Sequence, residues 1–296
     1  MRKIILSLFC FFCLSATVPY PTRIKDLPSK TALEILQKAY PNEIKEIVYD
    51  YKWKDWAMIA ETYSGDNVRL FWEEGKLLTE EQIPESHKYR SQFYGYPKKM
   101  KDPADMDDRY IAELKTHTSK EARKNGAVSS PVFFDTLYDA RSQESIEKRL
   151  TRVSFLGRRM TVHEKIAEPL ARVEKSIYRK RIWNADVRVF LHDLASCDCY
   201  HWREIRDSSS RSFHSYAIAV DVLPEGWGNK IVYWNWERNR NPDWMLVPIS
   251  KRWCPPQAVI DSFEAEGFIW GGKWAIWDNM HFEYRPELFL FTEAVR

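Results

Sequence analysis

The chain lacks a strong excess of charge of either sign. Its 296 residues include 45 Lys and Arg against 42 Asp and Glu, which leaves a formal net charge of +3. A dedicated nucleic-acid binder usually concentrates a larger basic excess, so we do not expect nucleic acid as a partner. No internal repeat is evident either. With 44% hydrophobic residues the chain can bury one large core or two modest ones, and we predict two domains.

Cysteines are scarce, with five in the whole chain, two of them close to the N-terminus. The others are Cys197, Cys199 and Cys254, an odd number that allows at most one internal disulfide. Cys197 and Cys199 flank a single residue and are poor partners for each other, whereas a bridge from either to Cys254 stays open. So few thiols also make a cysteine-rich zinc site an unfavourable interpretation.

Long hydrophobic runs are also missing. The longest near the N-terminus, residues 4–14, is too short to cross a bilayer about 30 Å thick. It follows a basic N-terminus and precedes small residues including Ala16, which is typical of a signal peptide. We predict a signal peptide over residues 1–16 and export to the periplasm or cell envelope without a membrane span. Lipid anchoring at Cys10 or Cys13 is less favoured, because neither follows the usual small residue.

The N-terminal half predicts a small antiparallel sheet. Residues 33–45 have helical periodicity, and three β-branched or aromatic runs follow, at Ile47–Trp53, Trp56–Ala60 and Val68–Trp72. Short polar turns separate these runs. We therefore predict an α+β region over residues 17–155, whose role as a wall-binding domain, an inhibitory cover or a scaffold the sequence leaves open.

We place a domain boundary near residue 155 and predict a second α+β domain over residues 156–296. This domain is expected to hold a small antiparallel sheet with flanking helices. The predicted helices are one capped by Thr161, with Val162, Ile166, Leu170, Val173 and Ile177 on one face, and one over 256–266 that ends at Gly267. The predicted strands are Val187–Leu191, Ala217–Val222 and His281–Tyr284.

An acidic residue stands in the middle of an apolar run. Ser212–Val222 reads as a buried strand, and Asp221 lies within it. A buried, unpaired carboxylate is costly, so a cation or several donors should satisfy Asp221. His214, at the start of the same run, is a natural partner on a metal ion.

A second polar group lies in Trp277–Tyr284, where apolar and polar residues alternate as in a half-buried strand. His281 and Glu283 then share a face, and Glu283 is expected to orient the imidazole rather than to bind the metal itself. Asp278 precedes the strand, within reach of a water on a metal that His281 holds. Taken singly, each histidine would be an ordinary core or surface residue.

Four ordered motifs together resemble the M15 family of metallopeptidases, which includes D-alanyl-D-alanine carboxypeptidases and related cell-wall endopeptidases. The resemblance covers roughly residues 160–290. Because it rests on four motifs in the same order, a chance match is a poor explanation for it. The motifs are Trp202–Ile205, Ser212–Asp221, Gly267–Gly272 and Asp278–Glu283. Two positions depart from the family pattern: Ala217 stands where relatives commonly have Gly, and Lys273 where an Asp is common.

The resemblance implies one zinc ion held by His214, Asp221 and His281, with Asp278 as catalytic base and Arg203 as the family's upstream arginine. Arg206 and Arg211 lie close enough in sequence to compete for that role. Three protein ligands leave a fourth tetrahedral position for water, whose pKa zinc lowers to about seven.

The implied activity is hydrolysis of the D-amino-acid-containing stem peptides of peptidoglycan, by a carboxypeptidase or an endopeptidase. A cell-wall binding module that keeps the scaffold without the chemistry is the alternative, although it would need no spare base at Asp278. A non-haem iron oxygenase also uses two His and one carboxylate, but its motif usually starts with His-x-Asp. Six residues separate His214 from Asp221 here, which disfavours that class.

Overall fold

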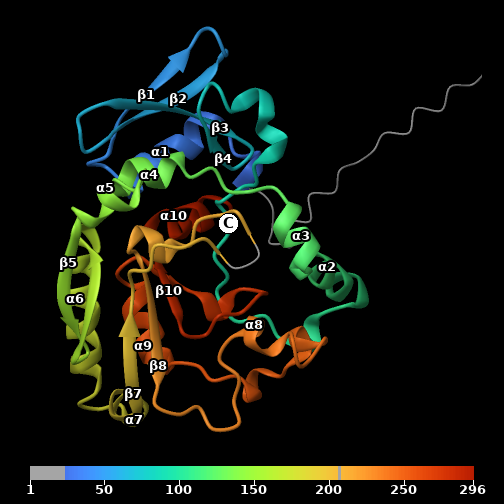
Figure 1. Ribbon diagram of the computed structural model, residues 1–296, viewed down its shortest axis with the longest axis vertical. Helices are drawn as coiled ribbons and strands as arrows, with labels where there is room; N and C mark the ends of the chain where they lie inside the picture. The colour runs from blue at the N-terminus through green and yellow to red at the C-terminus, as the bar shows by residue number, and fades with distance from the viewer. Residues whose placement is uncertain (1–23, 206–207) are drawn as a thin grey trace, which may run out of the picture.

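The computed structural model describes residues 24–205 and 208–296 (Figure 1). The predicted signal peptide, with Cys10 and Cys13, lies outside the described residues. Among the described residues no helix has the length and apolar character needed to cross a bilayer.

The N-terminal sheet has the predicted antiparallel strands and one more. It runs in the order β1-β2-β3-β4. The strands are β1 (Ile44–Asp50), β2 (Asp55–Glu61), β3 (Asn67–Glu73) and β4 (Lys76–Leu78). The turn from β3 to β4 places Glu74 and Gly75 at positive φ.

Helix α1 (Ser29–Ala39) packs against this sheet and ends earlier than the sequence predicted. The predicted helix ran to residue 45, but Lys45 lies in β1. The reason is Pro41, because a proline disfavours helical geometry in the residue before it. Tyr40 accordingly leaves the helix with φ −132° and ψ 62°.

Short helices connect this sheet to the rest of the molecule. They are α2 (Asp108–Thr118), α3 (Lys120–Asn125), α4 (Val132–Tyr138) and α5 (Gln143–Glu147), with short 3-10 turns at Ile24–Asp26, Ile83–Lys88 and Pro103–Asp105. A hairpin of β5 (Leu150–Phe155) and β6 (Arg158–His163) then leads into α6 (Glu164–Lys180).

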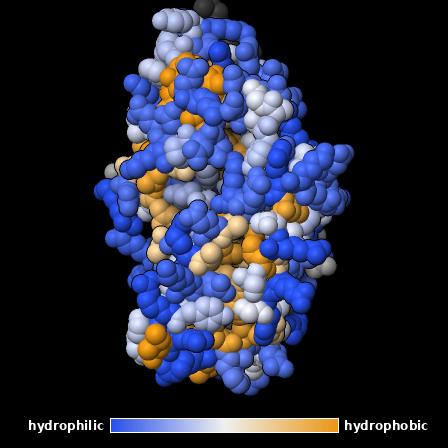
Figure 2. Space-filling model, turned by 90° about the vertical axis from the view of Figure 1, so that its left-hand side faces the viewer, coloured by the Kyte–Doolittle hydropathy of each residue, from blue (hydrophilic) through white to orange (hydrophobic). Residues whose placement is uncertain are grey.

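The predicted cap of α6 is wrong. Thr161 lies in β6, and His163 caps the helix by accepting a hydrogen bond from the Lys165 amide at 3.1 Å. The predicted apolar face is confirmed at Ile166, Leu170, Val173 and Ile177, which are all buried, while Val162 belongs to β6. The side of the molecule that carries β5 and α6 is mainly hydrophilic, with apolar residues scattered between (Figure 2).

The C-terminal sheet is antiparallel in the order β7-β8-β10-β9. Its strands are β7 (Leu194–Asp198), β8 (Ala219–Pro224), β9 (Phe268–Trp270) and β10 (His281–Tyr284). The helices around it are α8 (Trp234–Glu237), α9 (Gln257–Glu264) and α10 (Pro286–Ala294), with 3-10 turns at Trp244–Leu246 and Ile249–Lys251. Helix α9 ends at Glu264, earlier than predicted, and Gly267 closes the turn after it with a φ of +86°.

One predicted strand is a helix. Val187–Leu191 belongs to α7 (Ala185–Asp193), whose N-terminus is capped by the side chain of Asn184 on the Val187 amide at 3.1 Å. Val187 and Phe190, three residues apart, are both buried, as one face of a helix requires. A short apolar run is compatible with a strand or with a helix, and here the N-terminal cap at Asn184 favours the helix.

One hydrophobic core joins side chains from both halves of the chain. Helix α1 packs against α10 (Figure 1). The ring of Trp72 in β3 stacks on that of Phe291 in α10, with centroids 5.5 Å apart. The boundary predicted near residue 155 falls at the turn of the β5–β6 hairpin. The predicted fold class, α+β with small antiparallel sheets, is confirmed, while the division into domains stays a prediction.

Candidate metal centre

Three predicted ligands meet where β8 and β10 pair. Asp221 and His281 are direct cross-strand partners, so their side chains leave the same face of the sheet. His214 lies in the 3-10 turn η4 (Phe213–Tyr216) that precedes β8. The ligand atoms of the three residues all lie within 4.8 Å of one another. The fold therefore brings together the three groups that the sequence proposed.

Side chains along strand β10 alternate between the two faces of the sheet, with apolar residues on one face and polar residues on the other. Phe282 points into the core, where its ring stacks on Phe263 of α9 with centroids 3.9 Å apart. His281 and Glu283 point to the opposite face, and the His281 Nε2 atom donates to Glu283 Oε1 at 3.0 Å. The packing of Phe282 thus fixes which way the polar face turns.

Both imidazoles turn their second ring nitrogen toward the carboxylate of Asp221. His214 donates from Nδ1 to the carbonyl oxygen of Cys199 at 2.6 Å, which leaves Nε2 at 3.3 Å from Asp221 Oδ2. His281 donates from Nε2 to Glu283, which leaves Nδ1 at 2.8 Å from Asp221 Oδ1. Protein acceptors that orient the other ring nitrogen are typical of histidine metal ligands. The donor set therefore fits a cation such as Zn²⁺.

The electrostatics of the site also favour a positive charge between these groups. Burial alone would raise the pKa of Asp221, but His214 and His281 hold it well below its usual range. Burial lowers the pKa of His281, whereas its contacts with Asp221 and Glu283 raise it well above the usual value. An ionised Asp221 between two imidazoles favours either a proton on one of the rings or a bound cation.

Asp278 lies on the turn that enters β10. Its amide donates to the Gly271 carbonyl oxygen at 3.0 Å, and a Cβ on Gly271 would lie 2.7 Å from the Asp278 carbonyl oxygen. Only glycine allows this close approach. Asp278 Oδ1 is buried without a hydrogen-bond partner among the described residues.

Burial, with the negative charge of Asp221, raises the pKa of Asp278 to about 8, although His281 opposes the shift. A carboxyl group with a pKa near neutrality can accept and release a proton during catalysis. The buried, unpartnered oxygen and the raised pKa together make Asp278 the best candidate for the base.

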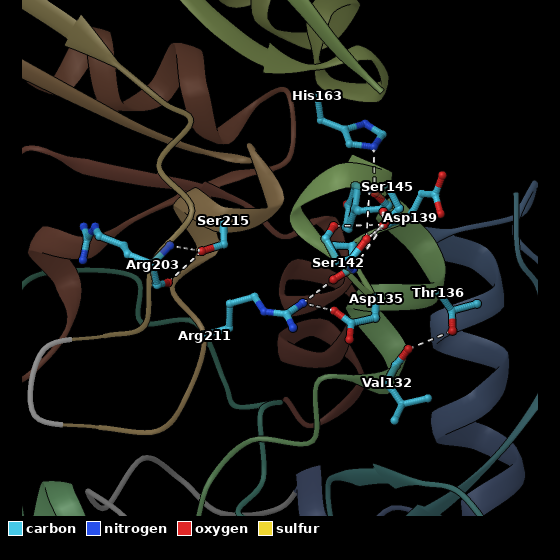
Figure 3. A network of polar contacts seen from close by, with 12 residues as sticks. Val132, Asp135, Thr136, Asp139, Ser142, Ser145, His163, Arg203, Arg211 and Ser215 are labelled. Atoms are coloured by element: carbon cyan, nitrogen blue, oxygen red, sulfur yellow. Dashed lines mark hydrogen bonds and ion pairs between the residues drawn. The ribbon is translucent and has the colours of Figure 1, made fainter. Parts of the chain in front are cut away.

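Arg203 is held beside the metal ligands through its backbone. Ser215 in η4 accepts a hydrogen bond from the Arg203 amide at 2.8 Å and donates one to its carbonyl oxygen at 2.7 Å (Figure 3). The Arg203 side chain is exposed and points away from Arg211 (Figure 3). It is therefore available to a ligand at the surface.

Arg211 has a structural role. It pairs with Asp135 of α4 and donates to the carbonyl oxygen of Ala140 (Figure 3). Arg206, the other arginine in this stretch, lies outside the described residues. Of the two described candidates for a substrate-binding arginine, Arg203 is the better one.

Tyr233 is a neighbour of the site that the sequence did not single out. Its backbone pairs with Asp278 in an isolated bridge. Burial and the charge of Asp278 raise the pKa of Tyr233 to about 12, while Arg203 is among the cations that oppose this shift. Tyr233 therefore lies within electrostatic range of both predicted catalytic residues. No spacing in the sequence indicates this position.

The two departures from the family pattern have different structural meanings. Ala217 has a φ of +53°, a left-handed conformation that costs a non-glycine residue about 1–2 kcal/mol. Lys273 is buried, bonds to Glu264 at 2.6 Å and lies 4.8 Å from the Tyr96 ring centroid. The charge of Lys273 is thus paired inside the fold, not presented to a ligand.

Other residues near the motifs belong mainly to the framework. Trp270 and Trp277 are core residues, whereas Trp274 lies with its ring centroid 5.6 Å from that of His281. His201 bonds to Asp198 at 2.5 Å.

The thiols do not contribute ligands or a disulfide. Cys197, Cys199 and Cys254 are all free. Burial raises the pKa of Cys197 to about 12 and that of Cys254 to about 11. Because a metal binds the thiolate form, these protonated thiols are poor ligands.

Comparison with known families supports one class of protein. Residues 206–284 match the family model described as D-alanyl-D-alanine carboxypeptidase. The match confirms the resemblance to the M15 family and supports a hydrolase. The matched range contains all three candidate ligands and Asp278, whereas Arg203 lies before it. Residues 32–94 match a domain of unknown function. No match was found among curated proteins or among solved structures.

Proposed function

We propose that this protein is an exported zinc-dependent peptidase that hydrolyses the D-amino-acid-containing stem peptides of peptidoglycan. One observation carries the proposal: two oriented imidazoles and a carboxylate converge beside Asp278, whose Oδ1 atom is buried without a hydrogen-bond partner among the described residues. The family match at residues 206–284 supports the peptide substrate.

Each residue has a distinct part in this reaction. His214, Asp221 and His281 would hold the zinc ion, which when bound polarises a carbonyl group and acidifies water. Asp278 takes a proton from the attacking water and returns it to the leaving amine. The Arg203 guanidinium binds the terminal carboxylate of the peptide or the developing oxyanion.

A cell-wall binding module without activity is the alternative. Such a module would have no use for Asp278 Oδ1, which is buried without a partner among the described residues. An unpaired buried polar atom lowers stability, and proteins keep such atoms mainly at functional sites. The position of Asp278 therefore favours the enzyme.

Digestion of purified peptidoglycan, analysed by mass, tests the function. The zinc-loaded protein should release D-alanine or cut between stem residues, chelator-treated protein should leave the substrate intact, and added zinc should restore cleavage. Intact peptidoglycan after incubation with folded, zinc-loaded protein would instead support the binding module.

A further inference from the structure

A chain of buried polar contacts connects the candidate ligand His281 to the N-terminal region. His281 bonds to Glu283 at 3.0 Å, and the second oxygen of Glu283 lies 3.6 Å from Arg285. Arg285 donates to Glu287, whose other oxygen accepts from the Tyr40 hydroxyl at 2.6 Å. All five side chains are buried, with exposed fractions of 8% or less.

The local backbone explains why four of these residues line up. His281, Glu283, Arg285 and Glu287 are every second residue along β10 and into the first turn of α10. Alternate residues of a strand share a face, and a polar contact joins each of the four side chains to the next. Tyr40 joins from the N-terminal region because Pro41 ends α1 at this point, next to α10.

Arg285 makes the largest number of the contacts described in this series, and we call it the junction of the series. Besides Glu283 and Glu287, its guanidinium donates to the Gln92 carbonyl oxygen at 2.8 Å. It also lies 4.9 Å from the ring centroid of Phe134 and 4.7 Å from that of Phe213. Phe213 directly precedes the ligand His214. Arg285 therefore contacts the segment that carries His281 and the segment that carries His214. The N-terminal region contacts the same arginine through Gln92.

The charge of Arg285 helps to fix the position of the Glu283 carboxylate. Burial lowers the pKa of Arg285, but Glu287 and Glu283 raise it above the usual value, so the guanidinium stays charged. A buried charge that loses its partner is strongly unfavourable. Glu283 divides its two oxygens between Arg285 and His281, so a rotation of its carboxylate would disturb both contacts.

We propose that Arg285, Glu287 and Tyr40 are positioning residues of the metal centre, through which the N-terminal region orients Glu283 and so His281. Residues 24–94 are then part of the metal site rather than a separable module. The inference rests on the proposed metal site but not on the identity of the substrate.

The structure offers a matched control. Tyr96 also comes from the N-terminal part, is as buried as Tyr40 at 5% exposure, and donates from its hydroxyl to Glu264 at 2.5 Å. Glu264 makes no contact with His281 among the described residues. The Tyr96 hydroxyl also accepts from the Trp270 amide of β9 at 2.8 Å. Tyr96→Phe thus removes a buried hydroxyl between the same two parts of the chain and leaves all five side chains of the proposed path in place.

The experiment compares the full-length protein with its Glu287→Gln, Tyr40→Phe and Tyr96→Phe variants. Zinc affinity is measured by competition with a chromophoric chelator, and the visible spectrum of the Co²⁺-substituted proteins is recorded. We expect about a tenfold weaker affinity for Glu287→Gln, the lower end of the range for outer partners of a metal ligand. Tyr40→Phe should show a smaller loss, both should shift the cobalt spectrum, and Tyr96→Phe should leave affinity and spectrum unchanged.

The inference would be overturned if Glu287→Gln and Tyr40→Phe both kept the zinc affinity of the wild type. It would also be overturned if Tyr96→Phe lost as much zinc affinity as these two variants. If Glu287→Gln does not fold, the comparison of the two Tyr→Phe variants decides. Wild-type protein that binds zinc but cleaves no peptidoglycan would contradict the proposed function alone. Losses of zinc affinity in Glu287→Gln and Tyr40→Phe would still support the inference in that case. Wild-type protein that binds no zinc would overturn the metal site and the inference with it.

Discussion

Replacement of Asp278 by alanine is expected to reduce peptide hydrolysis by about 10²–10⁴-fold, the range attributed to a positioned general base. Zinc content should not change, because the three proposed ligands are His214, Asp221 and His281. Asp278→Asn, which keeps the shape of the side chain, should be as inactive, since an amide cannot accept the proton. Initial rates on a stem peptide and metal analysis of the same samples provide the measurement.

Two results would contradict this assignment. A fully active Asp278→Ala variant would show that another group takes the proton. Loss of zinc along with activity would show that Asp278 is a ligand rather than a base. Because Oδ1 of Asp278 is buried without a partner among the described residues, its removal should not destabilise the fold, and melting temperatures should confirm this.

Replacement of His281 by alanine is expected to abolish both zinc binding and activity. The change removes one of three ligands and leaves Asp221 and Glu283 facing each other without the ring between them. Loss of an outer partner of a ligand already costs about 10–100-fold in affinity, so the loss of a ligand itself should exceed this range. Competition with a chelator gives the affinity directly.

His192→Ala is a suitable control for this variant. His192 is exposed and contacts its neighbour Asp193, so its removal changes the histidine count without touching the site. We expect wild-type zinc affinity and activity in this variant. If His281→Ala retained zinc at the wild-type level, the metal centre would lie elsewhere, and the proposed mechanism would fail with it.

The candidate site could be predicted because its residues carry local signals. An Asp inside an apolar run needs a partner, and strict alternation around His281 places Glu283 on the same face. The structure agrees on both points, since Asp221 pairs with His281 across two strands and Glu283 bonds to the ring. The catalytic roles of Asp278 and Arg203 stay predictions.

Other features had no local signal. Val187–Leu191 is apolar enough for a strand, and only the Asn184 cap and the spacing of its buried residues make it a helix. Thr161 is a good capping residue by type, but the pairing of β5 with β6 moves the cap to His163. In both cases a contact outside the run overrode the preference within it.

The sequence by itself determined the ligand types, the strand settings of Asp221 and His281, and the M15 resemblance, because these depend on periodicity and on the cost of burying a charge. The sequence predicted a strand at His214 too, whereas this residue lies in the 3-10 turn η4. Only the tertiary structure decided how Tyr40, Gln92 and Phe134 surround Arg285, or how Tyr233 comes beside Asp278. These contacts join residues up to 247 positions apart. Such pairings arise from packing of whole elements, which no short stretch of sequence encodes.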